Sequence, residues 1–280
     1  MKENETILME HEFNLSDFAL FLSVMKNPRA YQCVLSVFME EPDIELEEVK
    51  VEQVILNKVG KRAIRLDAWA KSTDQRQFNM EMQNDAQKDD VKKRSRYYQG
   101  LIDSPILKSG KKTKYKNLPS TVIIFITQED IFGRDLAKYT FTERCKEIED
   151  LELEDGTTKI FLNMASKNGT PELISMLQYI KQTRIDNPEI IVKDSRILEL
   201  DEIVTEVKCS EEWEAVKMNI LEVGIQQGIQ QGLHQKLIEL VGKKLEKGFS
   251  VPEIADMLEE SEETIEKVIE EIKKRSNGSQ

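Results

Sequence analysis

Two short segments with alternating apolar and polar residues constrain the fold of this 280-residue chain most. Residues 63–71 and 77–84 place apolar side chains at every second position, which is the period of a half-buried β-strand. The link at 72–76 is polar and short, so the two strands are expected to form a hairpin. The apolar face consists of Ile64, Leu66, Ala68, Ala70, Phe78, Met80 and Met82.

The opposite face of this hairpin carries polar residues, and two of them are carboxylates. If the turn is centred on Asp74, Asp67 lies directly across from Glu81, because both are equally far from the turn. Directly opposed side chains have Cβ atoms about 4.5–5.5 Å apart. Two carboxylates at that distance repel each other unless a proton or a cation lies between them, and Mg²⁺ or Mn²⁺ with oxygen ligands suits that position. The alternative is an ordinary solvated hairpin, in which Arg65, Trp69, Asn79 and Gln83 are surface residues like the pair.

The charge of the chain is uneven. Its formal net charge is −12 and its sequence pI is about 5.0, which on average argues against a nucleic-acid partner. Residues 92–116 nevertheless hold nine basic residues and one acid, a local balance of +8, whereas residues 201–280 hold 18 acids and 10 bases, a balance of −8. A local basic stripe is typical of a phosphate-binding surface, although a solvated helix and loop would also fit. The basic residues are Lys92, Lys93, Arg94, Arg96, Lys108, Lys111, Lys112, Lys114 and Lys116.

These two features adjoin each other in the chain. A helix is expected over about 88–107, directly after the strand that carries Glu81, and it begins with four of the basic residues. A carboxylate pair able to hold a metal, next to a helix able to hold phosphates, is what metal-assisted phosphodiester hydrolysis requires.

The remaining pattern predicts a mixed α/β core of about 190 residues. Helical segments are expected within 13–40, with Pro28 starting a second helix, and over 171–184 and 201–222. Further strands are expected at 49–57, 121–127 and 158–163. No stretch approaches the roughly 18–20 apolar residues of a membrane span, and no secretory signal is visible. Three scattered cysteines fit a reducing cytoplasm.

The C-terminal part has a different character. Gly224, Gly228 and Gly232 repeat every four residues and would place a stripe without side chains on one face of a helix, suited to another helix or marking a loosely helical connector. Residues 248–280 are typical of a helix-turn-helix, but the second helix is acidic and a polyanion would repel it. We therefore expect a packing or assembly module that favours homo-oligomers. The predicted domains are 1–200, 201–247 and 248–280.

The segment IRLDAWAKSTDQRQFNMEMQ, followed by KRSRYYQGLID, resembles the PD-(D/E)XK nuclease family transposases, also called recombination-promoting nucleases. The resemblance extends to LSDF, VIIFIT, IFG and KIFLN. It implies a restriction-endonuclease-like mixed sheet flanked by helices, with an α-helical C-terminal tail.

The resemblance also implies roles for individual residues. Asp67 and Glu81 match the metal-binding carboxylates, and Asp17 matches a further acidic position in the first helix. Gln83 stands where the wider superfamily usually has Lys; an amide can orient water but supplies no charge, so Arg94 or Arg96 is expected to supply it. DNA would be held by Lys92, Lys93, Arg94, Arg96 and Tyr97.

The sequence thus predicts a Mg²⁺-dependent DNA endonuclease in which Asp67, Glu81 and Gln83 are catalytic. One alternative is a catalytically degenerate protein that still binds DNA, and another is an assembly protein whose helical tail is the active part. Mobile-element movement, recombination and phage defence all fit the first interpretation.

Overall fold

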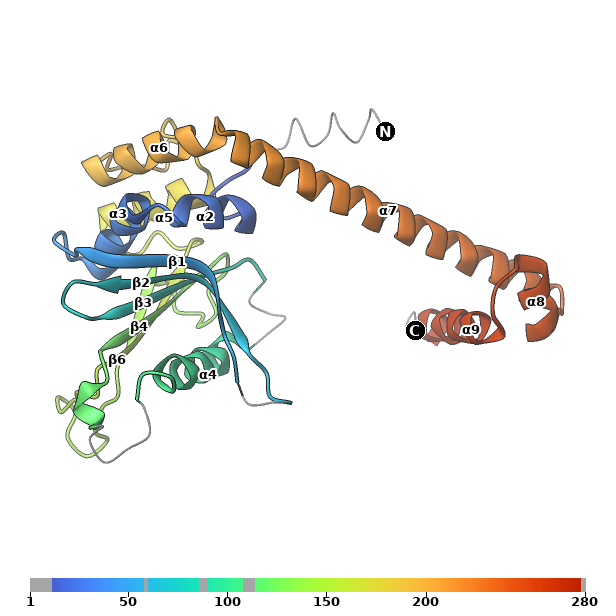
Figure 1. The fold of residues 1–280 in the computed structure, drawn as a ribbon, viewed down its shortest axis with the longest axis horizontal. Coiled ribbons are helices and arrows are strands. Elements are labelled where there is room, and N and C mark those ends of the chain that lie inside the picture. The colour runs from blue at the N-terminus through green and yellow to red at the C-terminus, as the bar shows by residue number, and fades with distance from the viewer. Residues whose placement is uncertain (1–11, 58–59, 86–89, 108–113, 278–280) are drawn as a thin grey trace. The chain divides into compact units, whose positions relative to one another are not determined.

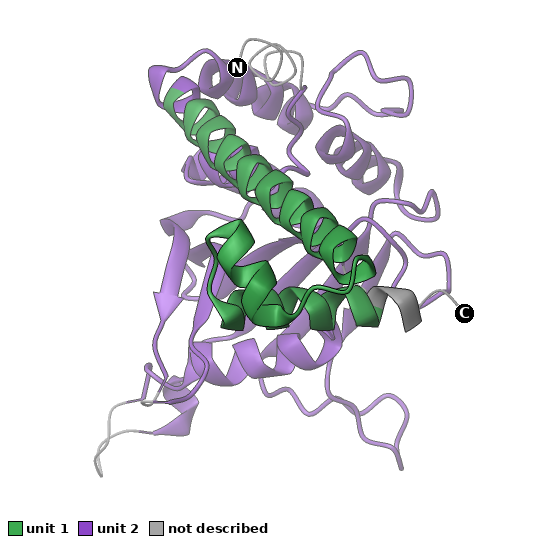
Figure 2. Ribbon diagram, turned by 90° about the vertical axis from the view of Figure 1, so that its right-hand side faces the viewer, with its two compact units in different colours: residues 1–11, 215–280 green, residues 12–214 purple. Residues whose placement is uncertain are grey.

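The structure is a computed structural model that describes residues 12–57, 60–85, 90–107 and 114–277. The chain divides into two compact units, drawn in two colours in Figure 2. One unit comprises residues 12–214, and the other comprises residues 215–280 together with 1–11. The boundaries predicted at 200 and 247 stay predictions.

The larger unit is built on a six-stranded mixed sheet with the order β1-β2-β3-β4-β6-β5 (Figure 1). The first three strands form an antiparallel meander, β3, β4 and β6 run parallel, and β5 pairs antiparallel with β6. The strands are β1 Leu46–Ile55, β2 Ile64–Ser72, β3 Gln77–Gln83, β4 Thr121–Thr127, β5 Lys138–Phe141 and β6 Thr157–Asn163. The short strand β5 was not expected from the sequence.

Helices cover both faces of this sheet. Figure 1 shows α2, α3, α5 and α6 stacked on one side of the sheet and α4 on the other. The helices are α2 Phe18–Met25, α3 Pro28–Met39, α4 Val91–Asp103, α5 Pro171–Lys181 and α6 Ser195–Lys208. A parallel pair of strands requires a crossover connection, and α4 supplies it between β3 and β4. Its apolar stripe of Val91, Tyr98 and Ile102 joins one hydrophobic cluster with Ile123 and Phe125 of β4.

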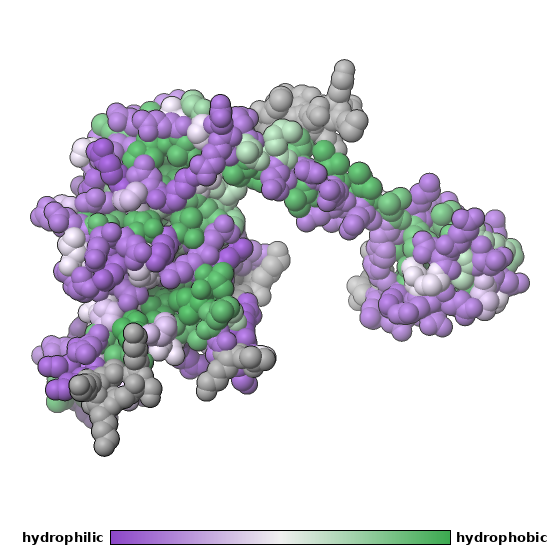
Figure 3. All heavy atoms as spheres, viewed as in Figure 1, coloured by the Kyte–Doolittle hydropathy of each residue, from purple (hydrophilic) through white to green (hydrophobic). Residues whose placement is uncertain are grey.

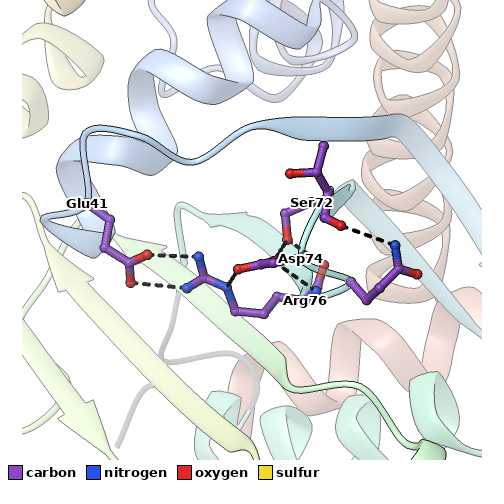
Figure 4. Close-up of polar contacts among 6 residues, drawn as sticks. Glu41, Ser72, Asp74 and Arg76 are labelled. Atoms are coloured by element: carbon purple, nitrogen blue, oxygen red, sulfur yellow. Dashed lines mark hydrogen bonds and ion pairs between the residues drawn. The ribbon is translucent and has the colours of Figure 1, made fainter.

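The register of the β2–β3 hairpin is the one predicted. The pairs run from Ala68↔Met80 to Lys71↔Gln77, so the turn is centred on Asp74. Figure 4 shows the polar network that holds this turn: the Ser72 hydroxyl and the Arg76 Nε both donate to the Asp74 carboxylate. Arg76 also donates from both terminal nitrogens to Glu41, at 3.1 and 2.8 Å, which ties the turn to the end of α3. The turn chemistry therefore fixes which residues of β2 and β3 face each other.

The alternative of an ordinary solvated hairpin is wrong for the two carboxylates. Asp67 is 5% exposed and Glu81 is 0% exposed, because α4 packs over this part of the sheet. The simple alternation along β2 also fails, since Ile64 and Leu66 belong to the same hydrophobic cluster as Trp69. The irregularity coincides with Glu52 of β1, which adopts φ 51° between the pairs Val51↔Ala68 and Gln53↔Leu66.

Several helix boundaries also differ from the sequence pattern. The helix expected over 201–222 is interrupted after Lys208, and α7 Glu211–Glu246 begins two residues after Cys209. The Ser210 hydroxyl accepts the backbone N–H of Trp213, so Ser210 starts the new helix. Helix α4 ends at Asp103 rather than near residue 107.

The smaller unit is a helical module with a core of its own. After α7 it contains α8 Val251–Leu258 and α9 Glu262–Asn277. A capping box between Ser250 and Glu253 starts α8. Its core consists of Ile238, Val241, Ile254, Ala255, Ile265 and Val268. In the described ranges no helix is long and apolar enough to cross a membrane.

Candidate active site

Asp67 and Glu81 are brought together by adjacent antiparallel strands. The backbone N–H of Asp67 donates to Glu81 Oε1 at 3.0 Å. In return, the backbone N–H of Met82 donates to Asp67 Oδ2 at 3.1 Å. These reciprocal bonds hold both carboxylates on the face of the sheet that α4 covers.

Arg94 reaches this pair from the first turn of α4. Its Nη2 donates to Glu81 Oε2 at 2.9 Å, and its Nη1 donates to Gln83 Oε1 at 2.8 Å. Its Nε donates to the hydroxyl of Tyr98 at 2.9 Å, and the guanidinium lies over the ring of Phe125. All three bonds and the ring contact restrict Arg94 to one orientation, in which its charge lies directly beside Glu81.

Asn79 completes the surroundings of Glu81, and sequence reasoning gave it no role. Its Nδ2 donates to Glu81 Oε1 at 2.9 Å. Asn79 is fully buried, and its Oδ1 has no hydrogen-bond partner among the described residues. A buried acceptor without a partner is costly, and such groups concentrate at functional sites. The signal in the sequence was a polar residue two positions before Glu81 on the same strand face.

Burial and mutual repulsion disfavour the charged forms of both carboxylates. Burial raises the pKa of Asp67 to about 6, against the opposing effects of the Met82 N–H and of Arg94. Burial and then the charge of Asp67 raise the pKa of Glu81 well above its ordinary value. Two such groups are stabilised by a nearby cation, and perturbed carboxylates in this arrangement are typical of functional sites.

The donor set fits a divalent cation held by two carboxylates. Asp67 Oδ1 and Glu81 Oε2 are the oxygens on which the strand backbone does not donate. Among the residues that the structure describes, no group of three or more His, Cys, Asp and Glu side chains is close enough to hold a metal.

Asp17 is not brought into this cluster. It precedes α2, where its Oδ2 accepts the backbone N–H of Asn14 at 2.7 Å. The neighbouring Ser16 carbonyl accepts a bond from Asn84, which follows β3. The start of α2 thus lies near the end of β3, but Asp17 contributes no third carboxylate beside Asp67 and Glu81.

The basic segment is divided between different places. Arg94 lies in the site, and Arg96 is exposed. Lys92 Nζ lies 4.3 Å from the centre of the Phe132 ring. Lys93 pairs with Asp90 at 3.1 Å. Lys114 and Lys116 are exposed before β4, at the end of the sheet where Gln77 pairs with Thr121 and away from Glu81. Lys108, Lys111 and Lys112 lie outside the described residues. Of the basic residues that the structure describes, those of α4 are the ones near the carboxylates.

The adjacent tyrosines of α4 have different surroundings. Tyr98 is 7% exposed and packs in the core against Phe125. Tyr97 is 39% exposed, but its hydroxyl donates to the carbonyl of Arg62 at 2.5 Å and accepts from Asn57 Nδ2 at 3.0 Å. Sequence reasoning missed this connection between α4 and the β1–β2 hairpin.

An antiparallel meander, a crossover helix and a parallel strand, with Asp on the second strand and Glu-x-Gln on the third, define a PD-(D/E)XK restriction-endonuclease-like class of protein. A comparison with protein families agrees with this. The family model for the PD-(D/E)XK nuclease family transposase matches residues 17–212, so the chain belongs to that family. Membership indicates a nuclease-like, transposase-type function with DNA as the substrate class. No curated protein and no solved structure matches the chain.

Proposed function

We propose that this protein is a metal-dependent DNA endonuclease that hydrolyses phosphodiester bonds. The observation that carries the proposal is the buried pair of Asp67 and Glu81 with Arg94 beside it. Two carboxylates exposed to solvent would cost the fold little. Burial of both under a helix destabilises the folded state, because each charge loses its hydration. A site that holds a cation and then a phosphate accounts for that cost.

Asp67 Oδ1 and Glu81 Oε2 would hold the cation, Mg²⁺ or Mn²⁺. When bound, such an ion lowers the pKa of a coordinated water and neutralises charge on the scissile phosphate. The protein's own contribution is to fix the ligands: the Asp67 N–H and Asn79 Nδ2 hold Glu81 Oε1, and the Met82 N–H holds Asp67 Oδ2. Outer groups of this kind orient metal ligands.

In this proposal Arg94, rather than Arg96, would supply the positive charge that Gln83 lacks. Arg94 contacts Glu81 and Gln83, whereas Arg96 is exposed on α4. Gln83 donates from Nε2 to the Asp85 carbonyl at 2.8 Å and accepts from Arg94 on Oε1. The second lone pair of that oxygen would position a water. Lys92, Lys93, Arg96 and the ring of Tyr97 would contact the DNA backbone along α4.

The test is cleavage of supercoiled plasmid with Mg²⁺, comparing the wild type with Asp67→Asn and Glu81→Gln. Both substitutions keep the side-chain volume, and both are expected to abolish nicking. Asp186→Asn, at an exposed surface ion pair with Arg184, is the matched control and should cleave like the wild type. Equal nicking by the wild type and Asp67→Asn would contradict the catalytic assignment.

A catalytically degenerate DNA-binding protein is the second candidate. It is favoured by one observation, which is that Arg94 already neutralises Glu81 and contacts Gln83. This candidate predicts DNA binding that survives Asp67→Asn and no metal-dependent cleavage by the wild type.

We also propose that the chain associates with itself through α7 and is cytoplasmic. Along the middle of α7, Met218, Ile229 and Leu233 are 58–63% exposed, and a Cβ placed on Gly224 or Gly228 would meet no described atom within 4 Å. Ile229→Glu should lower the mass measured by sedimentation if this face joins two copies. The three cysteines are free thiols, which supports a reducing compartment.

A further inference from the structure

The β1–β2 hairpin continues beyond Asp67 as a separate arm. We define the hairpin arm as residues 53–57 and 60–66, paired through Gln53↔Leu66, Val54↔Arg65 and Ile55↔Ile64. Figure 1 shows the two strands curving away from the rest of the sheet and passing beside one end of α4. The curve begins at Glu52, whose left-handed φ of 51° is unfavourable for a residue with a Cβ. The bend therefore lies beside Asp67.

The arm is fastened to the helix that carries Arg94. Tyr97 donates to the Arg62 carbonyl at 2.5 Å and accepts from Asn57, so one side chain holds both strands near the turn. Tyr97 lies less than one helical turn after Arg94. The position of the arm is thus coupled to the position of the candidate active site.

The surface of the arm combines cations with exposed apolar side chains. Leu56 is 79% exposed and Val54 is 56% exposed. In Figure 3, apolar residues gather where the hairpin leaves the sheet. Lys61 and Arg62 are exposed beside them. Among the described residues, α4 adds the exposed cations Lys92, Lys93 and Arg96 to this pair, and Lys93 pairs with Asp90. Arg65 of the arm pairs with Glu52 and lies over the ring of Phe18 of α2, so it belongs to the other side of the sheet.

We propose that the hairpin arm enters the minor groove of duplex DNA next to the phosphate held at Asp67 and Glu81. Lys61 and Arg62 would contact phosphates on the two sides of the groove, and Leu56 would press against a base step. Apolar wedges flanked by cations are how proteins grip the minor groove. This inference rests on the proposed nuclease function and deepens it, because it makes duplex DNA the substrate.

The spacing supports this placement. Arg62 lies five residues from Asp67, and a fully extended chain of that length spans at most about 16 Å. That is about half of the ~34 Å helical turn of a duplex. A duplex that presents one phosphate to the carboxylates therefore presents the neighbouring groove to the arm. The described cations Lys61, Arg62, Lys92 and Arg96 favour a polyanion over a neutral peptide as the partner of the arm and α4.

The first test measures binding of full-length protein to a 30-base-pair duplex by fluorescence anisotropy, with Ca²⁺ replacing Mg²⁺ so that cleavage does not interfere. The double variant Lys61→Gln/Arg62→Gln should reduce the slope of log K against log salt by about 1.8, from two lost phosphate contacts. Lys181→Gln/Lys193→Gln removes two exposed cations elsewhere and should leave the slope unchanged. An unchanged slope in the arm variant would overturn the proposal.

The second test examines the wedge. A 2-aminopurine placed at successive positions of the duplex should brighten where Leu56 unstacks a step. Leu56→Ser should remove this signal and Leu56→Met should retain it. Equal affinity of the wild type for the duplex and for one of its strands would also refute the inference.

These results separate the arm from the nuclease activity. If Asp67→Asn abolishes cleavage while the arm variants bind and unstack DNA normally, only the arm proposal fails. If the wild type neither cleaves nor binds DNA, the proposed function itself fails.

Discussion

Arg94 donates to Glu81 at the same carboxylate oxygen, Oε2, that a divalent cation would use. The other oxygen, Oε1, is already held by Asn79 and by the Asp67 N–H. Arg94 and a metal bound as proposed would therefore compete for, or share, one oxygen. Arg94 is thus the counter-ion of Glu81, and under the proposed function it would also regulate metal affinity.

Replacement of Arg94 should separate these effects. Arg94→Gln leaves Glu81 buried without its cation, and we expect stability to fall by about 3 kcal/mol. Added Mn²⁺ should restore more stability to this variant than to the wild type, because the metal no longer meets a competing charge. Thermal melting with and without Mn²⁺ measures both. If the metal-induced rise in Tm is the same in both proteins, the competition does not exist.

Removal of Asn79 should weaken metal binding without touching a ligand. Asn79→Ala deletes the donor to Glu81 Oε1 and leaves that carboxylate less well oriented. Loss of such an outer group typically costs ten- to a hundredfold in metal affinity. Isothermal titration with Mn²⁺ should show this decrease, and Ser23→Ala on the opposite side of the sheet is the control. An unchanged affinity of Asn79→Ala for Mn²⁺ would show that Asn79 contributes to the core and not to metal binding.

The network at the hairpin turn should couple Arg76 to Glu41. Their bidentate pair is partly exposed, with side chains 25% and 42% accessible, so solvent screening limits its strength. We expect Arg76→Gln and Glu41→Gln each to lower the unfolding free energy by about 1 kcal/mol. In a double-mutant cycle the two losses should be less than additive. Additive losses would show that the turn does not depend on this pair.

Asp130 should contribute an acid-sensitive part of the stability. Some desolvation acts to raise its pKa, but donors from the Phe132 and Asp135 N–H groups and the Tyr139 hydroxyl outweigh it and lower the pKa to about 2. A lowered pKa in the folded state stabilises the protein above the unfolded value near 3.9. That stability is lost as pH falls through about 2. Denaturant unfolding at a series of pH values from 6 to 2 gives the unfolding free energy as a function of pH. This free energy should fall less steeply with decreasing pH for Asp130→Asn than for the wild type. An equal pH dependence in both proteins would contradict the prediction.

The hairpin and its register could be predicted because they depend on local information. Residue alternation at period two and the length of the turn place Asp67 opposite Glu81, and neither depends on the rest of the chain. The burial of the pair could not be predicted, because alternating polar residues look the same under a helix as in water. Which of Arg94 and Arg96 faces the pair depends on the rotation of α4 about its axis. That rotation is set by Tyr98 and Ile102 packing on β4.

The hairpin arm was missed for a related reason. Its bend depends on Glu52 in a left-handed conformation, and nothing in the identity of a glutamate indicates that. The hydrogen bond from Tyr97 to the Arg62 carbonyl joins segments far apart in the sequence. Its acceptor is a backbone oxygen, which every residue has, so the sequence does not indicate the bond.

The turn centred on Asp74 makes the pairing of Asp67 with Glu81 sensitive to any change in the length of the hairpin. One residue inserted between Ser72 and Arg76 would shift the pairing of β2 and β3 by one position, and Asp67 and Glu81 would no longer lie opposite each other. Loops elsewhere in the larger unit can grow or shrink without this effect. Among related sequences, insertions and deletions should therefore collect outside residues 67–81, and this hairpin should keep its length even where its residues drift.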